Sequence, residues 1–341
     1  MISDNVKNST GAKADVIARR SITRRAALGG AALALLPAAA RAGDYPSGPV
    51  KLIVPVPAGG VTDIMARTIG QRLQELWGQT VIVDNRPGGN YGVGAQAVER
   101  APADGLTLLV APDSTFTANP ALLARLPYDP KAFTPISVLC RATPMLMVHP
   151  SLPVKTVPEL IAHAKANPGK LNYGSFGVGT YAHLSMEDFK QRTGTSMQHI
   201  PYRGAAPALT GLLAGDVSVM LLNLSSVEEH ARSGKVRIVA AATGSRAAAM
   251  PDVPTISESG VPGFSTSVWF ALWGPGNLPP ALTARIHADV SKVLELAPTR
   301  EFFKTNSFQR VDITPAQFGE LIASDLEHWS RLIQAVGARI E

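Results

Sequence analysis

The sequence is poor in cysteine, in charged residues and in long apolar runs, and each shortage excludes a class of protein. Cys140 is the only cysteine among 341 residues, so no intramolecular disulfide can form. It lies in the apolar run 136–140, which predicts a buried strand rather than a catalytic thiol. Charged residues make up 17% of the chain and hydrophobic residues 45%, which argues against disorder. After Gly43 no run approaches the roughly 18 apolar residues of a membrane-spanning helix.

The formal net charge of +6 is concentrated at the N-terminus. Residues 1–42 contain seven Lys or Arg against two acids, so the rest of the chain carries a formal charge of only +1. Binding to DNA or RNA needs basic residues clustered on the folded part of a protein. We therefore expect no nucleic-acid partner.

Residues 1–42 have the pattern of an export signal that is cleaved. The paired Arg24 and Arg25 precede an Ala/Leu/Gly run, and the triplet 40–42 fits an A-x-A cleavage site. The apolar run is too short to span a bilayer. The arginine pair favours twin-arginine export, although two alanines follow it where a bulky apolar residue is usual. The sequence predicts a mature chain that begins at Gly43 and is soluble outside the cytoplasm.

After Gly43, short β-rich runs alternate with segments of helical periodicity, which is the pattern of an α/β protein with largely parallel sheets. The same unit of strand, glycine-rich turn and helix occurs in two blocks. The first has a strand at 51–56 and a helix from Thr62 that Gly78 ends. The second has a strand at 170–173 and a helix at 180–192.

Two further apolar runs, 145–148 and 267–273, flank the second block. We expect them to pair with each other as the strands that cross between two domains. The first domain would then be discontinuous, with residues 43–143 and 266–341, and the second would cover 144–265. The apolar face of the C-terminal helix, which includes Phe318, is expected to cover the sheet of the first domain.

Enzyme signatures are missing from the sequence: it has no H-E-x-x-H, C-x-x-C, G-x-S-x-G or P-loop motif, and its seven histidines lack ligand-like spacing. A G-x-G-x-x-A motif begins at Gly92, but the strand before it ends near Val83. A dinucleotide-binding fingerprint needs its first glycine directly at the strand end. We therefore expect no metal, no cofactor and no catalysis. The alternative is an exported α/β enzyme acting on carboxylic acids, with Ser114, Ser175 or His183 recruited for catalysis.

Two glycine-rich loops, 58–63 and 176–180, are suited to holding a small anion. Each precedes a helix, where unpaired N–H groups and the helix dipole favour a carboxylate, phosphate or sulfate. One loop from each domain would face the other across a cleft. Each loop also has an ordinary interpretation, because glycine-rich turns end strands in many α/β proteins and Asp63 is suited to capping a helix.

In and around these loops the sequence resembles the periplasmic solute-binding proteins of tripartite tricarboxylate transporters, the Bug (Bordetella uptake gene) family. Each matching segment is modest alone, but their order along the mature chain is specific. The resemblance rests on residues 45–54, 57–63, 66–67, 83–90, 167–171, 173–180, 183–184, 201–204, 212–215, 254–255 and 260.

The resemblance implies an α/β, two-domain periplasmic binding protein (Venus-flytrap) fold with the ligand cleft between the domains. Such a protein captures a small organic carboxylate in the periplasm. It delivers this ligand to an inner-membrane permease made of a large and a small subunit. We expect a monomer. A ligand-dependent partner of a membrane sensor is the alternative that keeps the same fold.

The resemblance further implies that both loops and ordered water grip the ligand carboxylate, rather than an arginine. His183 is expected to orient the second loop or to be structural, and Arg86 to be structural. The candidate ligand-binding residues are Gly59, Gly60, Thr62, Asp63, Asn90, Ser114, Thr115, Ser175, Gly177, Gly179, Thr180 and Tyr202.

The run 217–222 departs from the family pattern. Members commonly show V-D-x-M-F-D there, and this sequence has lost both acids, with Leu222 in place of the second. If that position faces the cleft, the distal part of the site becomes more apolar. The change would then favour monocarboxylates or aromatic acids over citrate or amino acids.

Overall fold

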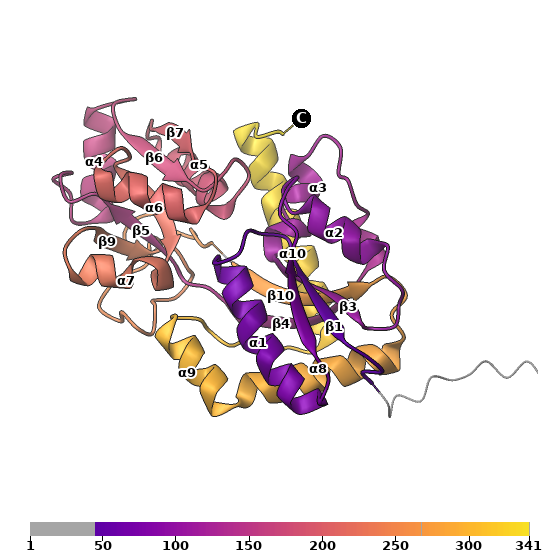
Figure 1. Ribbon diagram of the computed structural model, residues 1–341. Coiled ribbons are helices and arrows are strands. Elements are labelled where there is room, and N and C mark those ends of the chain that lie inside the picture. The colour runs from indigo at the N-terminus through magenta and orange to yellow at the C-terminus, as the bar shows by residue number, and fades with distance from the viewer. Residues whose placement is uncertain (1–44, 267, 341) are drawn as a thin grey trace, which may run out of the picture. The chain divides into compact units, whose positions relative to one another are not determined.

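The computed structural model describes residues 45–266 and 268–340 (Figure 1). The expected export signal and its cleavage site lie outside these residues. The described residues form an α/β protein with two mixed sheets of five strands each. Over the same ranges, no helix combines the length and the apolar character needed to cross a bilayer.

The first sheet has the strand order β2-β1-β3-β10-β4. β1 runs parallel to β2 and β3, whereas β10 is antiparallel to β3 and β4. Cys140 lies in β4 and is fully buried, as its apolar run predicts. The strands are β1 (Val50–Val54), β2 (Val81–Asn85), β3 (Thr107–Pro112), β4 (Phe133–Arg141) and β10 (Trp269–Pro275).

The second sheet repeats this plan with the order β7-β6-β8-β5-β9. β6 is parallel to β7 and β8, and β5 is antiparallel to β8 and β9. The strands are β5 (Pro144–Val148), β6 (Asn172–Ser175), β7 (Gln198–Pro201), β8 (Val219–Asn223) and β9 (Arg237–Ala241).

Two expectations about the sheets are wrong. The sheets are mixed rather than largely parallel, and the runs at 145–148 and 267–273 do not pair with each other. β5 lies in the second sheet between β8 and β9, and β10 lies in the first between β3 and β4. β5 enters its sheet directly from β4, and β10 enters its sheet through a segment between Ala241 and Trp269 whose described residues form no helix. They therefore lack the helical crossover that would make them parallel to a neighbour.

The chain changes sheets twice, between Arg141 and Pro144 and between Ala241 and Trp269. We call the residues around the first sheet, 45–143 and 268–340, the first lobe, and residues 144–266 the second lobe. The changes of sheet fall close to the expected domain boundaries. The division into two domains at those boundaries stays a prediction.

Helices cover both faces of the first sheet. Leu52 packs in one apolar cluster with Met65 of α1, whereas the neighbouring Ile53 packs in another with Val98 of α2. α10 joins the second cluster through Phe318, whose ring lies 5.4 Å from that of Trp269, so the C-terminal helix covers the first sheet as expected. The helices are α1 (Val61–Trp77), α2 (Gly92–Glu99), α3 (Asn119–Leu122), α8 (Pro280–Glu295), α9 (Ala297–Thr305) and α10 (Pro315–Val336).

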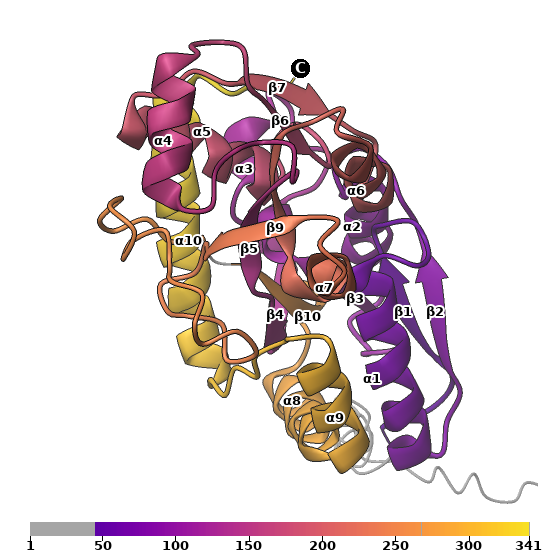
Figure 2. The same cartoon turned by 90° about the vertical axis from the view of Figure 1, so that its left-hand side faces the viewer.

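The second sheet is covered in the same way. Figure 2 shows α4 and α5 on one side of it and α6 and α7 on the other. Alternation along β5 agrees, because Leu146 packs in the cluster of Leu160 of α4 and Met145 in that of Leu212 of α6. The helices are α4 (Val157–Ala166), α5 (Tyr181–Thr193), α6 (Ala205–Ala214) and α7 (Leu224–Arg232).

Candidate functional site

The first loop joins β1 to α1 and is organised by the carboxylate of Asp63. This side chain is buried and accepts hydrogen bonds from the Gly59 N–H at 2.9 Å, Asn85 Nδ2 at 2.9 Å and Arg67 Nε at 3.1 Å. Burial alone would raise the pKa of Asp63, but these hydrogen bonds lower it below its ordinary value. The Asp63 carboxylate is therefore ionised and satisfied inside the protein.

Beyond Asp63 the first loop is open. A Cβ added at Gly59 would meet no atom of the described residues within 4 Å, and Gly59 has a φ of +84°. α1 begins after Gly60 with no side-chain cap among the described residues. The internal hydrogen bonds of the helix start with the Ile64 N–H, which donates to the Gly60 carbonyl at 3.0 Å. The first-turn N–H groups, including that of the buried Thr62, point out of the N-terminal end of α1.

The second loop joins β6 to α5 and is closed by its own side chains. Ser175 Oγ accepts from the Gly177 N–H at 3.2 Å and donates to the Gly177 carbonyl at 3.1 Å. Thr180 Oγ1 donates to the same carbonyl at 2.7 Å. The Gly179 N–H donates to His183 Nδ1 at 3.2 Å. The N–H groups of Gly177 and Gly179 therefore have partners within the protein, and His183 is one of them.

Tyr202 lies beside this loop. Its N–H donates to the Ser175 carbonyl at 2.9 Å. Gly211 leaves room for its ring, since a Cβ there would collide with the phenol. The structure thus brings Tyr202 together with Ser175, Gly177, Gly179 and Thr180, as the sequence predicts.

The other three candidates form a third group in the first lobe. The Asn90 carbonyl accepts from Asn119 Nδ2 at 2.6 Å, and the Thr115 carbonyl accepts from the Tyr128 hydroxyl at 2.5 Å. The phenol of Tyr91 is hydrogen-bonded to the Ser114 side chain. Asn90, Ser114 and Thr115 are therefore neighbours.

The third group contains a residue that sequence reasoning missed as part of the site. Asp113 is buried, and its Oδ2 has no hydrogen-bond partner among the described residues. Burial, and then the charge of Asp325, raise the pKa of Asp113 well above its ordinary value. Its place directly after the buried strand β3 was the available signal, because ligand groups gather at the carboxyl ends of strands in α/β folds.

The third group and the second loop meet where the lobes touch. A Cβ added at Gly179 would collide with Leu122 of α3 and lie 3.5 Å from Ile340. Tyr181, the first residue of α5, donates to Asn223 Oδ1 at 2.9 Å. Burial, followed by the charge of Asp113 in the first lobe, raises the pKa of Tyr181. The contacts of the first loop lie instead in its own lobe, with β2 through Asn85.

Three other residues considered in the sequence analysis make contacts that explain them structurally. Arg86 pairs with Asp84 at 2.9 Å, in agreement with the structural role expected for it. Gly94 packs against Pro55 of the neighbouring strand end, which explains the G-x-G pattern by packing. Leu222 is buried in the apolar cluster on the α6 and α7 side of the second sheet. It does not line a cleft, so the preference for monocarboxylates inferred from it is unsupported.

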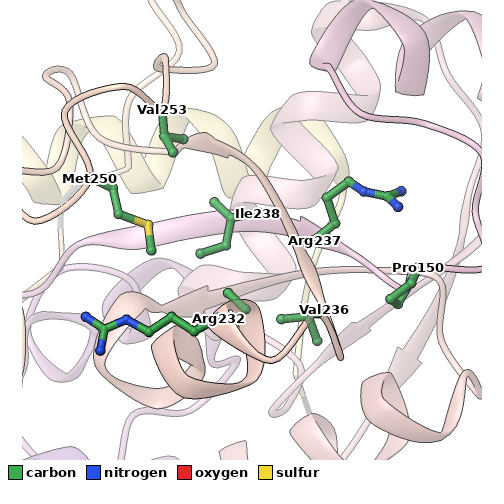
Figure 3. Close-up of a pocket in the computed structure, with 9 residues that line it drawn as sticks. Pro150, Arg232, Val236, Arg237, Ile238, Met250 and Val253 are labelled. Atoms are coloured by element: carbon green, nitrogen blue, oxygen red, sulfur yellow. The ribbon is translucent and has the colours of Figure 1, made fainter.

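A hollow elsewhere in the second lobe is shown in Figure 3. Its cations are already engaged, since Arg237 donates to the Leu152 and Val154 carbonyls and Arg232 pairs with Glu228. None of the candidate residues is among those that line it, which are Pro150, Ala231, Arg232, Gly234, Val236, Arg237, Ile238, Met250 and Val253. Within residues 45–266 and 268–340, no group of three His, Cys, Asp or Glu side chains could hold a metal ion.

Comparison with known proteins places this geometry in a family. The model of the tripartite tricarboxylate transporter family receptor matches residues 65–338. Protein BugT of Bordetella pertussis strain Tohama I is 34% identical over 302 residues, which cover 88% of this chain and 93% of BugT.

Solved structures agree with this match. The structure of R. palustris Rpa4515 with adipate is 32% identical, with a TM-score of 0.81, and covers 87% of this chain and 100% of its own. MatC (Rpa3494) from Rhodopseudomonas palustris with bound malate is 28% identical, with a TM-score of 0.77. The match covers 85% of this chain and 100% of MatC. The periplasmic binding protein BugD is also 28% identical, with a TM-score of 0.77. The match covers 87% of this chain and 100% of BugD. The chain therefore has the two-domain solute-binding fold and belongs to the Bug family of tripartite tricarboxylate transporter receptors.

Proposed function

We propose that this protein is a periplasmic solute-binding protein that captures a small organic carboxylate between its lobes. It delivers this ligand, as a monomer, to the large and small membrane subunits of a tripartite tricarboxylate transporter permease. The observation that carries the proposal is the match, over nearly the whole length of both chains, to receptors whose structures hold adipate and malate. Both of those ligands are small organic acids.

The local geometry supports carboxylate binding at two helix starts. α1 and α5 begin after glycine-rich loops, and neither has a side-chain cap among the described residues. Their first-turn N–H groups and dipoles favour an anion. Because α1 belongs to the first lobe and α5 to the second, a carboxylate held by both would join the lobes.

We divide the candidate residues by what their atoms are free to do. Several have partners inside their own loop and would shape it: Gly59 and Asp63 in the first loop, and Ser175, Gly177, Gly179 and Thr180 in the second. The remainder would contact the ligand or its water through backbone or hydroxyl groups. These are Gly60, Thr62, Asn90, Ser114, Thr115 and Tyr202.

We propose binding without turnover, although Ser175 and His199 form a serine-histidine contact of 2.7 Å. Ser175 is fully buried, and its hydroxyl is tied to the N–H and carbonyl of Gly177. A serine nucleophile must reach the substrate, and its base must be oriented by a third group. Among the described residues, the His199 ring is hydrogen-bonded to Ser175 and has no acid bonded to it.

The first test identifies the ligand. Native mass spectrometry of the purified protein should show a co-purified acid, and unfolding followed by refolding should remove it. Calorimetry with the refolded protein should then give saturable binding to that acid or to adipate or malate. Failure to bind any organic acid would overturn the proposal, and conversion of the bound acid into a product would favour the enzyme.

A matched pair of variants tests the second loop. Thr180→Ala should weaken binding by roughly tenfold, because it removes a hydrogen bond of about 1.4 kcal/mol, from Thr180 Oγ1 to the Gly177 carbonyl, that holds the loop in shape. Thr210→Ala removes a comparable hydroxyl hydrogen bond, 3.1 Å long, from the exposed surface of α6 and should leave affinity unchanged.

Uptake of the radiolabelled acid in a strain lacking the protein tests the permease. Uptake should be lost if the protein serves a permease, whereas a protein that serves a membrane sensor would leave uptake intact when it is missing.

A further inference from the structure

The second loop rests on two stacked histidines. We propose that His183 and His199 are positioning residues that hold this loop in its ligand-binding shape, and that they do so only while the His183 imidazole is neutral. The inference rests on the proposed function and adds a control by pH to the same site. It is carried by the hydrogen bonds that each ring makes to the loop and by the contact between the rings.

His183 is the hydrogen-bond acceptor for the loop. Its ring is 8% exposed, and its Nδ1 accepts from the Gly179 N–H at 3.2 Å. A neutral imidazole can accept there only when its proton is on Nε2. Protonation turns Nδ1 into a donor, so the Gly179 N–H would lose its acceptor and face another N–H group.

His199 supports the other half of the loop through Ser175. Its Nε2 lies 2.7 Å from Ser175 Oγ, which in turn donates to the Gly177 carbonyl. A proton on His199 Nε2 completes this chain, since the serine hydroxyl is then free to donate to Gly177. The two imidazoles thus support Gly177 and Gly179, the glycines that turn the loop with φ values of +141° and +82°.

The two rings are coupled because they stack. The centroids of His183 and His199 are 4.2 Å apart at an interplanar angle of 20°, and Tyr173 stacks on the far face of His199 at 4.9 Å. A proton on one ring therefore places a positive charge against the other. Burial lowers the pKa of His183, and burial together with the charge of His183 lowers the pKa of His199 to about 4.

The charged side chains around the two stacked histidines have opposing effects on the histidine pKa values or are engaged with other groups. Glu187, further along α5, raises the pKa of both histidines, whereas Lys190 lowers it. These two side chains pair with each other at 2.7 Å, Glu187 also accepts from the Tyr173 hydroxyl, and Lys190 lies 5.5 Å from the Tyr173 ring centre. α10 also packs against α5, but its Asp325 is bonded to Trp269.

The consequence for function is release in acid. Gly179 lies against Leu122 of the first lobe, so a change in the loop also changes the contact between the lobes. Because the pKa of His183 is lowered, its neutral form persists below the ordinary histidine value of about 6.5, and affinity should fall in more acidic solution as His183 takes up a proton. The expected loss is about tenfold for each hydrogen bond that the loop gives up.

Nuclear magnetic resonance of the refolded, ligand-free protein tests the positions of the protons. Near pH 7.5, nitrogen-15 shifts of the imidazoles should show His183 neutral with its proton on Nε2. The Gly179 amide signal should then move with the titration of His183 in acid. A charged His183 near neutral pH, or a Gly179 amide that ignores the titration, would overturn the proposal without any ligand being needed.

Calorimetry of the variants tests the control of binding, with adipate and malate as probes. His183→Asn keeps an acceptor near the position of Nδ1, and His199→Gln keeps a donor near that of Nε2, but neither side chain titrates. Both variants should bind as the wild type does near pH 7.5, and His183→Asn should lose less affinity than the wild type near pH 4.5, whereas His199→Gln, in which His183 still titrates, should keep the loss. His163→Gln, a change on α4, should keep the wild-type pH dependence.

The two proposals fail in different ways. Wild-type protein that binds no acid at any pH overturns the proposed function, and the resonance experiment still decides whether the histidines position the loop. Wild-type protein that binds but shares its pH dependence with His183→Asn overturns the histidine control alone. Because all variants meet the same probe, the titration of the ligand itself cancels from the comparison.

Discussion

At the scale of single residues, Asp113 stands out, because its buried carboxyl carries an oxygen with no partner among the described residues. Burial and Asp325 raise its pKa, so the folded protein binds this proton more tightly than the unfolded chain does. For an acid with a raised pKa, stability is highest in acid. It falls as the pH rises from the ordinary aspartate value of about 3.9 toward the raised one.

Asp113→Asn should therefore flatten the pH dependence of stability. The amide cannot ionise, so the variant should gain stability relative to the wild type as the pH rises from about 4 to about 8. Urea unfolding across this range measures the free energy of unfolding. Asp252→Asn, at an exposed position, should leave the slope unchanged, and an equal slope in Asp113→Asn would contradict the shift.

The pKa of Asp63 is shifted in the opposite direction, so its effect on stability has the opposite pH dependence. Its lowered pKa means that it stabilises the folded state above its ordinary pKa and that this contribution is lost as the pH falls through the lowered value. Asp63→Ala should lower the free energy of unfolding at neutral pH by about 2 kcal/mol, because it removes the acceptor of the Gly59 N–H and one of the two acceptors of Asn85 Nδ2. Chemical denaturation measures the loss, and an unchanged midpoint would show that the first loop does not depend on this carboxylate.

At the scale of elements, the second loop is fixed from both lobes. Gly179 needs its φ of +82° and also leaves room for Leu122, whereas Gly194 at the end of α5 has a φ of +62° and open space around it. Comparing the same substitution at the two glycines therefore separates the cost of backbone strain from the cost of a collision. An alanine in the left-handed region costs about 1 kcal/mol at either site.

Gly179→Ala should consequently abolish ligand binding in calorimetry, while Gly194→Ala lowers stability slightly and binds normally. Adding Leu122→Ala to Gly179→Ala removes the colliding carbons and should restore part of the affinity. If Gly179→Ala binds as the wild type does, the loop does not need its observed position against α3. If the double variant shows no recovery, the collision is not the cause of the loss.

Much of this element structure could be predicted from the sequence. The spacing of Met65, Ile69 and Leu73 predicts α1, and Gly78 ends it with a φ of +66°. The directions of β5 and β10 could not be predicted, because a local apolar run does not state which strand will lie beside it. The same limit applies to the site: the loops are visible in the sequence, but the use of the Gly179 N–H by His183 depends on how α5 folds back onto the loop.

At the scale of the whole molecule, the chain connects its two sheets through one short segment and one long segment. Only residues 142 and 143 separate β4 from β5, and the return runs from Ala241 to Trp269. Few backbone angles in these segments would have to change to move one lobe against the other. We expect the hinge near residues 143–146 and 264–268.

Small-angle scattering should then show compaction when the ligand binds, since closure removes solvent from the site. Binding should also stabilise the protein, by about 2.7 kcal/mol at a ligand concentration 100-fold above Kd. Thermal unfolding with and without the acid measures this gain. A stabilised protein with an unchanged radius of gyration would indicate a cleft that is already closed before the ligand arrives.

The burial of Cys140 has a practical consequence for building a reporter. The only thiol of the chain lies in β4 with none of its surface exposed, and burial raises its pKa, so it is protected from alkylating dyes. Val178, on the second loop, is 39% exposed. A fluorophore attached through Val178→Cys would therefore label one site in the native protein, and its emission would follow loop rearrangement without removal of the natural cysteine.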